Sequence, residues 1–235
     1  MAVSTDGKRE IVGLHIGPSE AEIFWSTFLK SLVKRGLRGT KLVISDAHEG
    51  LKAAIRRVLG STWQRCRVHW MRNAQAYVSK GQQNMVSAAL RQAFTQLDYQ
   101  NATQTMRHVA DQLRDNWSKL GAFIDDSEAD VLAYMNFPTQ HRVKIHSTNP
   151  IERLNKEVKR RADVVGIFPN EGAIIRLIGA VLLEANDEWQ LQHRYMQTEA
   201  MAKLTPPTID AVPTQIATIA AWSVTNSTTP LFTPA

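Results

Sequence analysis

The sequence predicts an α/β protein in which a helical block interrupts a smaller strand-containing region. Short apolar runs of the buried-strand type alternate with helical patterns in the first third of the chain, an order typical of α/β architectures. Helical periodicity alone then continues from Trp70 to about Tyr134. The expected parts are a first α/β segment (1–75), a helical insertion (76–147), C-terminal helices (148–203) and a flexible tail (204–235).

The first elements are expected to be a hairpin followed by a helix. Asp6-Gly7 is a turn signal, and residues 10–17 after it have the pattern of a short strand. Ser19 and Glu22 have the spacing of a capping box. The helix that they begin is expected to end near Gly36, where basic residues precede a glycine.

Two further strands are expected, each followed by a helix. The apolar run 42–45 predicts a buried strand with Asp46 at its end, and a helix begins near Gly50. Residues 64–69 predict another strand, which ends at His69. Functional groups gather at the carboxyl ends of strands in open sheets, so Asp46 is a candidate site residue. The simpler alternative is that Asp46 only caps the next helix.

The last third of the chain is expected to contain two helices and then a tail. One helix begins at Asn149-Pro150, because proline is tolerated in a first helical turn. Another spans about 171–186, after a break at 167–170. Proline, threonine, alanine and serine are abundant in residues 204–235, a composition that predicts little fixed structure.

Composition indicates a globular protein with an anionic partner. The chain has 235 residues, a hydrophobic fraction of 43%, a net charge of +6 and a pI near 9.6, which together favour a nucleic-acid partner. Its single cysteine, Cys66, excludes an internal disulfide and indicates a reducing compartment. The sequence has no apolar run of membrane-spanning length and no signal-like start, so we expect a cytoplasmic protein.

Positive charge is concentrated in two zones. Residues 50–97 contain eight Lys or Arg and no acid, and residues 141–161 contain seven Lys or Arg against two acids. If the zones meet in space they form one surface for DNA phosphates, and otherwise each is a separate solvated face. The expected DNA contacts are Arg65, Arg72, Arg153, Lys156, Lys159, Arg160 and Arg161.

Glu152 lies inside the second basic zone, and two roles for its carboxylate are open. Glu152, Asn155 and Lys159 share a helix face, which could present a carboxylate, an amide and a cation together. If the fold brings Glu152 close to Asp46, the two carboxylates could bind a divalent cation such as Mg²⁺. The equally simple alternative is a surface ion pair with Lys156, four residues on.

The Cys66-x-x-His69 pair is a weak metal signal. A structural zinc site needs four ligands, and the chain has no second cysteine and no other histidine at a recognisable ligand spacing. A buried cysteine beside a hydrogen-bonded histidine is therefore favoured. A Cys–His nucleophile lacks an evident residue to orient the histidine.

Several segments together resemble the bacterial Mutator-type insertion-sequence transposases, over about residues 6–195. The matching segments are Asp6–Glu10, Ser45–Leu51, Trp63–His69 with Arg72-Asn73, Asn149–Asn155 with Lys159–Arg161, Gly166–Asn170 and Asp187–Trp189. The resemblance implies an RNase H-like catalytic domain with a helical insertion. It also implies an Asp–Asp–Glu triad that binds two Mg²⁺ (or Mn²⁺) ions and cuts and joins DNA at transposon ends.

The resemblance also implies roles for single residues. Asp46 matches the second aspartate and Glu152 the glutamate, and both are expected to be catalytic and to bind metal. The expected supporting residues are Cys66, His69, Asn149 and Asn155. The implied partners are transposon-end and target DNA, together with a second copy or intact transposase, in a nucleoid-associated protein.

The first aspartate of the triad is expected to be absent from this chain. In the family it lies on the first strand of the sheet, upstream of the strand at 10–17, and Asp6 matches the turn position instead. We therefore expect an incomplete domain that does not catalyse transposition alone. The alternatives are a non-catalytic fragment that binds DNA or associates with intact transposase as an inhibitor, and a remnant gene product without function.

Overall fold

The computed structural model describes residues 1–17, 21–204 and 216–217, which are mostly helical with two small sheets, compatible with an α/β fold. The strands are β1 (Ala2–Val3), β2 (Arg9–Glu10), β3 (Leu42–Ser45), β4 (Thr62–Arg65) and β5 (Ile216–Ala217). The helices are α1 (Glu22–Lys34), α2 (Glu49–Leu59), α3 (Arg67–Gln75), α4 (Gln83–Phe94), α5 (Tyr99–Arg114), α6 (Ser118–Leu132), α7 (Thr139–Ile145), α8 (Asn149–Val165), α9 (Glu171–Leu191) and α10 (Thr198–Met201), with 3₁₀ turns η1 (Ala133–Asn136) and η2 (Ala202–Leu204).

The N-terminal hairpin forms as predicted, but its second strand is shorter than expected. β1 pairs antiparallel with β2, and the turn between them contains Gly7 at a φ of 78°. The predicted strand over 10–17 is wrong beyond Glu10. From Ile11 the backbone leaves the ladder, because the Ile11 N–H donates to the Asn186 side chain of α9 at 2.9 Å instead of to a strand. Two side chains of this segment still pack, Val12 against the cluster of α1 and α2 and Leu14 against the cluster of α8 and α9.

The two central strands form a parallel pair buried on both faces. β3 and β4 align Leu42 with Thr62 and Ser45 with Arg65. Because side chains alternate along a strand, Ile44 packs into the core of the helical block, while Val43 packs against α1 and α2. This arrangement confirms the buried strand predicted at 42–45.

The predicted strand at 64–69 is wrong in its second half. β4 ends at Arg65 and α3 begins at Arg67, so His69 lies in the first turn of a helix. The chain turns because the Arg67 N–H donates to the carbonyl of His146 at 2.9 Å, outside the sheet. Trp70 then enters the core of the helical block, where its indole N–H donates to Ser127 at 2.7 Å.

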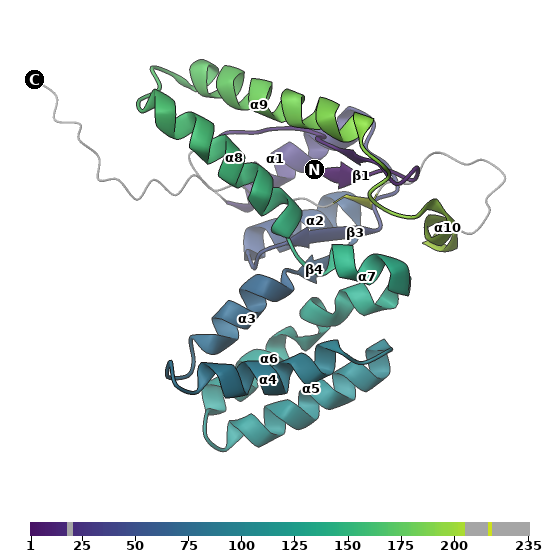
Figure 1. The fold of residues 1–235 in the computed structure, drawn as a ribbon, viewed down its shortest axis with the longest axis vertical. Helices are drawn as coiled ribbons and strands as arrows, with labels where there is room; N and C mark the ends of the chain where they lie inside the picture. The colour runs from purple at the N-terminus through teal and green to yellow at the C-terminus, as the bar shows by residue number, and fades with distance from the viewer. Residues whose placement is uncertain (18–20, 205–215, 218–235) are drawn as a thin grey trace, which may run out of the picture.

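The helical block and the strands share one hydrophobic core. Helices α3 to α6 lie on one side of β3 and β4, and α8 and α9 lie on the other (Figure 1). Leu42 and Ile44 of β3 belong to the same buried cluster as Trp70, Leu90 and Ile124 of the block. Within the described part of the chain, no helix is long and apolar enough to cross a membrane.

The remaining helix boundaries follow the predictions with small shifts. α1 begins at Glu22 after Ala21, and Ser19, the predicted cap, lies outside the described residues. α8 begins at Asn149 with proline in its first turn, as predicted. α9 continues to Leu191, beyond the expected end near 186.

Most of the predicted tail lies outside the described residues. Within it, the structure describes Leu204 in η2 and the short strand β5. β5 pairs antiparallel with β1 and also contacts β3, so it lies between the two sheets. The expectation of a flexible segment at 204–235 stays a prediction.

Candidate active site

Asp46 lies at the carboxyl end of β3, half exposed to solvent. One of its carboxylate oxygens, Oδ1, accepts a hydrogen bond from the Ala47 N–H at 2.8 Å. The cap of α2 is His48, whose Nδ1 accepts from the Leu51 N–H at 3.2 Å. The capping role considered for Asp46 is therefore taken by another residue, and 53% of the Asp46 side chain remains exposed.

Cys66 and His69 lie next to Asp46 because of the parallel register. Ser45 and Arg65 are paired at the ends of β3 and β4, so the residues that follow them leave the sheet side by side. Cys66 is fully buried, and its N–H donates to the Ser45 carbonyl at 2.8 Å. One helical turn into α3, Nδ1 of His69 lies 3.7 Å from Oδ2 of Asp46.

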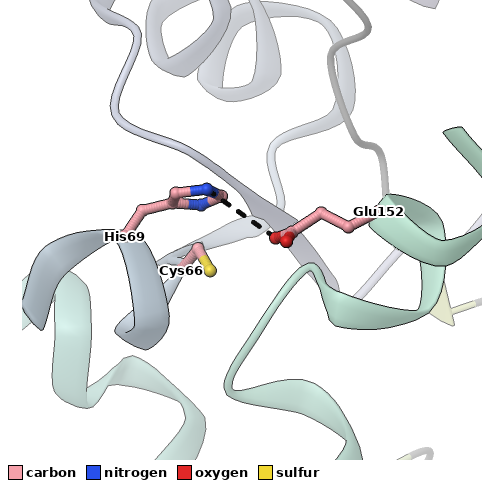
Figure 2. A group of neighbouring side chains, drawn as sticks. All are labelled: Cys66, His69 and Glu152. Atoms are coloured by element: carbon pink, nitrogen blue, oxygen red, sulfur yellow. Dashed lines mark ion pairs between the residues drawn. The ribbon is translucent and has the colours of Figure 1, made fainter. Parts of the chain in front are cut away.

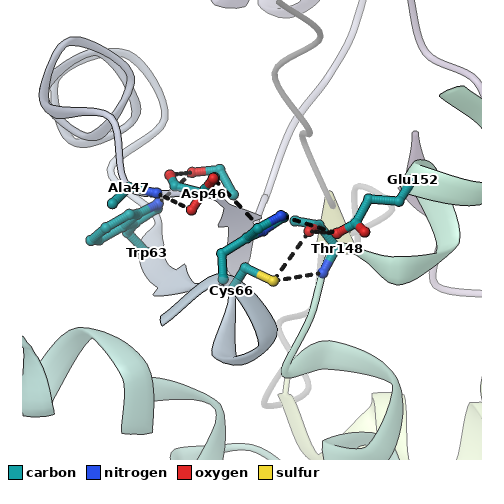
Figure 3. A network of polar contacts seen from close by, with 8 residues as sticks. Asp46, Ala47, Trp63, Cys66, Thr148 and Glu152 are labelled. Atoms are coloured by element: carbon teal, nitrogen blue, oxygen red, sulfur yellow. Dashed lines mark hydrogen bonds and ion pairs between the residues drawn. The ribbon is translucent and has the colours of Figure 1, made fainter. Parts of the chain in front are cut away.

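Glu152 reaches the same place from the first turn of α8. Its Oε1 atom lies 3.8 Å from Nε2 of His69 and accepts a hydrogen bond from the Thr148 hydroxyl at 2.7 Å. Thr148 also lies against the buried thiol, with its Oγ1 3.2 Å and its N 3.4 Å from Sγ of Cys66 (Figure 3). The ion pair considered with Lys156 does not form, since the described partner of Glu152 is His69.

The imidazole of His69 therefore lies between two carboxylates that are 106 positions apart in sequence (152 − 46 = 106). Interaction with the Cys66 thiol raises the pKa of His69, burial opposes this, and the charges of Asp46 and Glu152 raise it further. Burial alone would raise the pKa of Cys66, but hydrogen bonding from His69 and Thr148 lowers it. The site thus places the His69 ring among two carboxylates and a thiol that favour its protonated form.

Three side chains have atoms close enough to bind one metal ion together. The Sγ of Cys66, a ring nitrogen of His69 and a carboxylate oxygen of Glu152 lie within 4.8 Å of one another (Figure 2). This is a mixed sulfur, nitrogen and oxygen set without the fourth ligand of a structural zinc site. Asp46 lies outside this group of three, and no other such group occurs among the described residues.

The two asparagines expected to support the site lie elsewhere on α8. Asn149 is exposed and lines a cavity on the other side of the helix, together with Arg153. Asn155 lines an apolar pocket with Leu154. Among the described hydrogen bonds, none joins either amide to a carboxylate of the site.

The basic residues expected to contact DNA fall into three groups. Arg65 is partly buried with its guanidinium 5.0 Å from the Phe123 ring, and burial lowers its pKa. Arg160 and Arg161 donate to the carboxylate of Glu157 at 2.6 and 2.9 Å. The third group is exposed and makes no ion pair with a described residue: Arg72, Arg153, Lys156 and Lys159.

The two basic zones adjoin at the site. The contact between Arg67 and His146 joins the start of α3 to the segment before α8. Thr148, which connects Cys66 to Glu152, was not identified by the sequence reasoning. The only signal available was its position one residue before the Asn149-Pro150 helix start, where a side chain normally caps the helix.

Comparison with known proteins decides the family. The sequence profile of the Mutator family of transposases matches residues 1–192. The chain belongs to the Mutator family of transposases. This confirms the resemblance inferred from the sequence motifs, which fall almost entirely within the matched region.

Transposases of several insertion sequences are similar to this Mutator-family chain. The transposase for IS1081 of Mycobacterium tuberculosis is 42% identical over 202 residues, which are 86% of this chain and 49% of that protein. The transposase for IS256 in transposon Tn4001 of Staphylococcus aureus is 41% identical over 192 residues (80% and 49%). The transposase for IS406 of Burkholderia multivorans is 37% identical over 198 residues (83% and 51%). The chain spans about half the length of these curated relatives.

Proposed function

We propose that this chain provides two carboxylates, Asp46 and Glu152, of a metal-dependent site that cuts and joins DNA at the ends of an insertion sequence. The domain that holds them would be RNase H-like, with a helical insertion over residues 76–147 that contains α4 to α7. The observation that carries the proposal is the convergence of both carboxylates on the His69 ring, at 3.7 and 3.8 Å. Membership of the Mutator family of transposases supports DNA cutting and joining as the class of reaction.

The donor chemistry of the two carboxylates fits Mg²⁺ or Mn²⁺. Both are oxygen ligands, and their side chains are 53% and 36% exposed, which leaves room for the waters that Mg²⁺ retains. The thiol and imidazole beside Glu152 suit softer metals, but Cys66 is fully buried and already contacts Thr148. We therefore assign the metal to Asp46 and Glu152, and the His69 ring that lies between them would have to turn aside for both carboxylates to reach one ion. When bound, it would polarise a phosphodiester and activate a water or a 3′-hydroxyl.

The neighbouring residues would hold these carboxylates in place. The Thr148 hydroxyl orients Glu152, and the Ala47 N–H orients Asp46. In the absence of a cation, a protonated His69 offsets the repulsion between the two acids. The buried Cys66 thiol interacts with the His69 ring and would help to fix its position.

Exposed cations near the site would bind the DNA backbone. Lys156 and Lys159 follow Glu152 at helical spacing and have no described ion-pair partner. Phosphate contacts of this kind position a duplex without reading its sequence.

The chain alone would be inactive, because two carboxylates do not make a triad. Among the described residues, no third carboxylate completes a cluster with Asp46 and Glu152, and the side chain between them is a histidine. A triad would need another acid. The same observation favours the alternative function, in which the chain binds DNA or associates with an intact transposase and inhibits it without cutting.

Metal binding tests the assignment of the two carboxylates directly. We expect the purified chain to bind Mn²⁺, measured by electron paramagnetic resonance titration, and Asp46→Asn or Glu152→Gln to weaken binding at least about tenfold. The matched control is Glu171→Gln, an exposed acid in the first turn of another helix, α9. Equal Mn²⁺ affinity of all four proteins would refute the site.

A DNA cleavage assay tests whether the chain cuts insertion-sequence ends or inhibits an intact transposase. A duplex carrying an insertion-sequence end is incubated with the chain and Mg²⁺, with and without an intact Mutator-family transposase. We expect no nicking by the chain alone, because the cluster has two carboxylates. Nicking that disappears in Asp46→Asn would overturn that expectation. Reduced cleavage by the intact enzyme when the chain is added would support the inhibitor alternative.

A further inference from the structure

A cavity lined by cationic side chains lies on the other side of α8 from Glu152. It is a cavity of about 420 Å³ formed by β2, the segment before α8, the first turns of α8, and the end of α9. Its cationic lining residues are Arg9, Lys144 and Arg153, and its aromatic walls are Trp189 and Tyr195. Arg9 and Trp189 come from two of the sequence motifs for which the candidate active site provides no role.

The Arg9 side chain is held in place by aromatic rings. Its guanidinium carbon lies 4.5 Å from the centre of the Trp189 ring and 4.7 Å from that of Tyr195, and its Nη2 donates to Gln192 at 3.0 Å. Lys144 lies over the same tyrosine ring at 4.7 Å. Arg9 thus lies against both rings and Lys144 against one of them, so the Arg9 guanidinium is fixed in the wall of the cavity with its edge as the group that can donate to a ligand.

The hairpin turn builds this cavity. The Gly7 carbonyl accepts hydrogen bonds from the N–H groups of Tyr195 and Met196 at 2.7 and 3.0 Å. A Cβ atom on Gly7 would lie 2.1 Å from the Met196 carbonyl oxygen, and the backbone there has a φ of 78°. Only glycine satisfies both conditions, so the Asp6-Gly7 turn places Tyr195 against Arg9.

The charges in this cavity are not balanced by the described residues. Burial lowers the pKa of Arg9, interaction with Tyr195 opposes this, and the nearby positive charge of Arg153 lowers it further. Arg153 has no described hydrogen bond or ion pair. Glu157 also lines the cavity, but its carboxylate oxygens already accept from Arg160 and Arg161.

Like charges held together in a half-buried cavity cost free energy unless an anion binds between them. We propose that Arg9 and Arg153 form a phosphate-binding pocket for the sugar–phosphate backbone of DNA, separate from the Asp46–Glu152 site. Planar guanidinium groups bind phosphate oxygens in a bidentate manner, which is the geometry that a fixed Arg9 offers. Contacts of this kind are made to phosphates and not to base edges, so we expect binding to be independent of DNA sequence.

The test measures DNA binding by the full chain as a function of salt. Fluorescence anisotropy with a labelled duplex is compared for the native chain, Arg153→Gln, and the matched control Arg91→Gln. Arg91 is an exposed arginine of α4 without a described ion pair, in the helical block away from α8 (Figure 1). We expect Arg153→Gln to weaken binding roughly threefold to tenfold and to lower the slope of log K against log salt by about one.

Three results would contradict binding of the DNA backbone by Arg9 and Arg153. Equal effects of Arg153→Gln and Arg91→Gln would show only general loss of charge. A loss of affinity for one DNA sequence but not for another would show base contacts. Inorganic phosphate binding that depends on Arg153, with unchanged DNA binding, would identify a free-phosphate site. None of these results depends on metal binding by Asp46 and Glu152, so this inference and the proposed function fail independently.

Discussion

Glu152 and Arg153 are neighbours in α8, but they face two different environments. Successive helical residues point about 100° apart, so one side chain meets His69 and Thr148 while the other meets the cavity of Arg9. The environment of Glu152 combines a carboxylate, a hydroxyl and an imidazole. The environment of Arg153 combines like charges. The comparison shows that one helix start can serve a carboxylate site that favours a cation and a cationic pocket that favours an anion.

The largest effect on stability is expected at the Glu152 site. Thr148→Val removes the hydroxyl that donates to Glu152 while keeping the shape of the buried side chain. A hydrogen bond to a charged group contributes about 1.5 kcal/mol or more, so we expect a loss of that size in the free energy of unfolding, measured with urea. Thr148→Ser retains the hydroxyl and is expected to lose less. Equal losses in the two variants would contradict the role given to the hydroxyl.

A smaller, pH-dependent effect is expected for His69. Its folded pKa is raised above the ordinary value of 6.5, chiefly by Cys66 and then by Asp46 and Glu152, against the effect of burial. The stability it contributes is therefore fully present below pH 6.5 and is lost as the pH rises through the higher folded pKa. We expect His69→Gln to cost about 1 kcal/mol at pH 6 and less at pH 9.

The control for this pH dependence is His108→Gln, which changes an exposed histidine of α5. It should leave the difference between pH 6 and pH 9 as it is in the native chain. A cost for His69→Gln that grows with pH would mean that the neutral ring, and not the imidazolium, stabilises the site.

The smallest effect on stability is expected at Glu157, which lines the Arg9–Arg153 pocket. Hydrogen bonds from Arg160 and then Arg161 lower the pKa of Glu157 to about 2, but all three side chains are exposed. Glu157→Gln should change stability little and increase DNA affinity roughly twofold to fivefold, because it removes an acid from the pocket lining and releases Arg160, while Arg161 keeps its ion pair with Glu184. Anisotropy at fixed salt measures this, with Glu171→Gln as the control. Weaker DNA binding in Glu157→Gln would contradict the pocket.

The sequence predicted the local elements well where one segment decides them. The buried strand before Asp46 and the helix at Asn149-Pro150 follow from apolar runs and from the tolerance of proline in a first turn. The strand expected to reach His69 was wrong, because α3 begins early through a contact with His146, more than 70 positions away. Short apolar runs carry no information about such partners.

The candidate site was predictable only in part. Asp46 and Glu152 were identified by position and by family resemblance, but the ring between them, and Thr148 behind Glu152, depend on distances across the fold. Arg153 was expected to contact DNA, but its pocket with Arg9 was not predicted, since Arg9, Arg153 and Trp189 come from distant parts of the chain.

By itself the sequence determined the family, the α/β class, the basic character and the candidate carboxylates, because motifs, periodicity and charge are local properties of the chain. The tertiary structure decided which charges balance each other. Glu152 could have paired with Lys156 within its own helix, yet it faces His69 of α3. Electrostatic interactions depend on the separation of atoms in space and on burial, and both are set only when distant segments pack together.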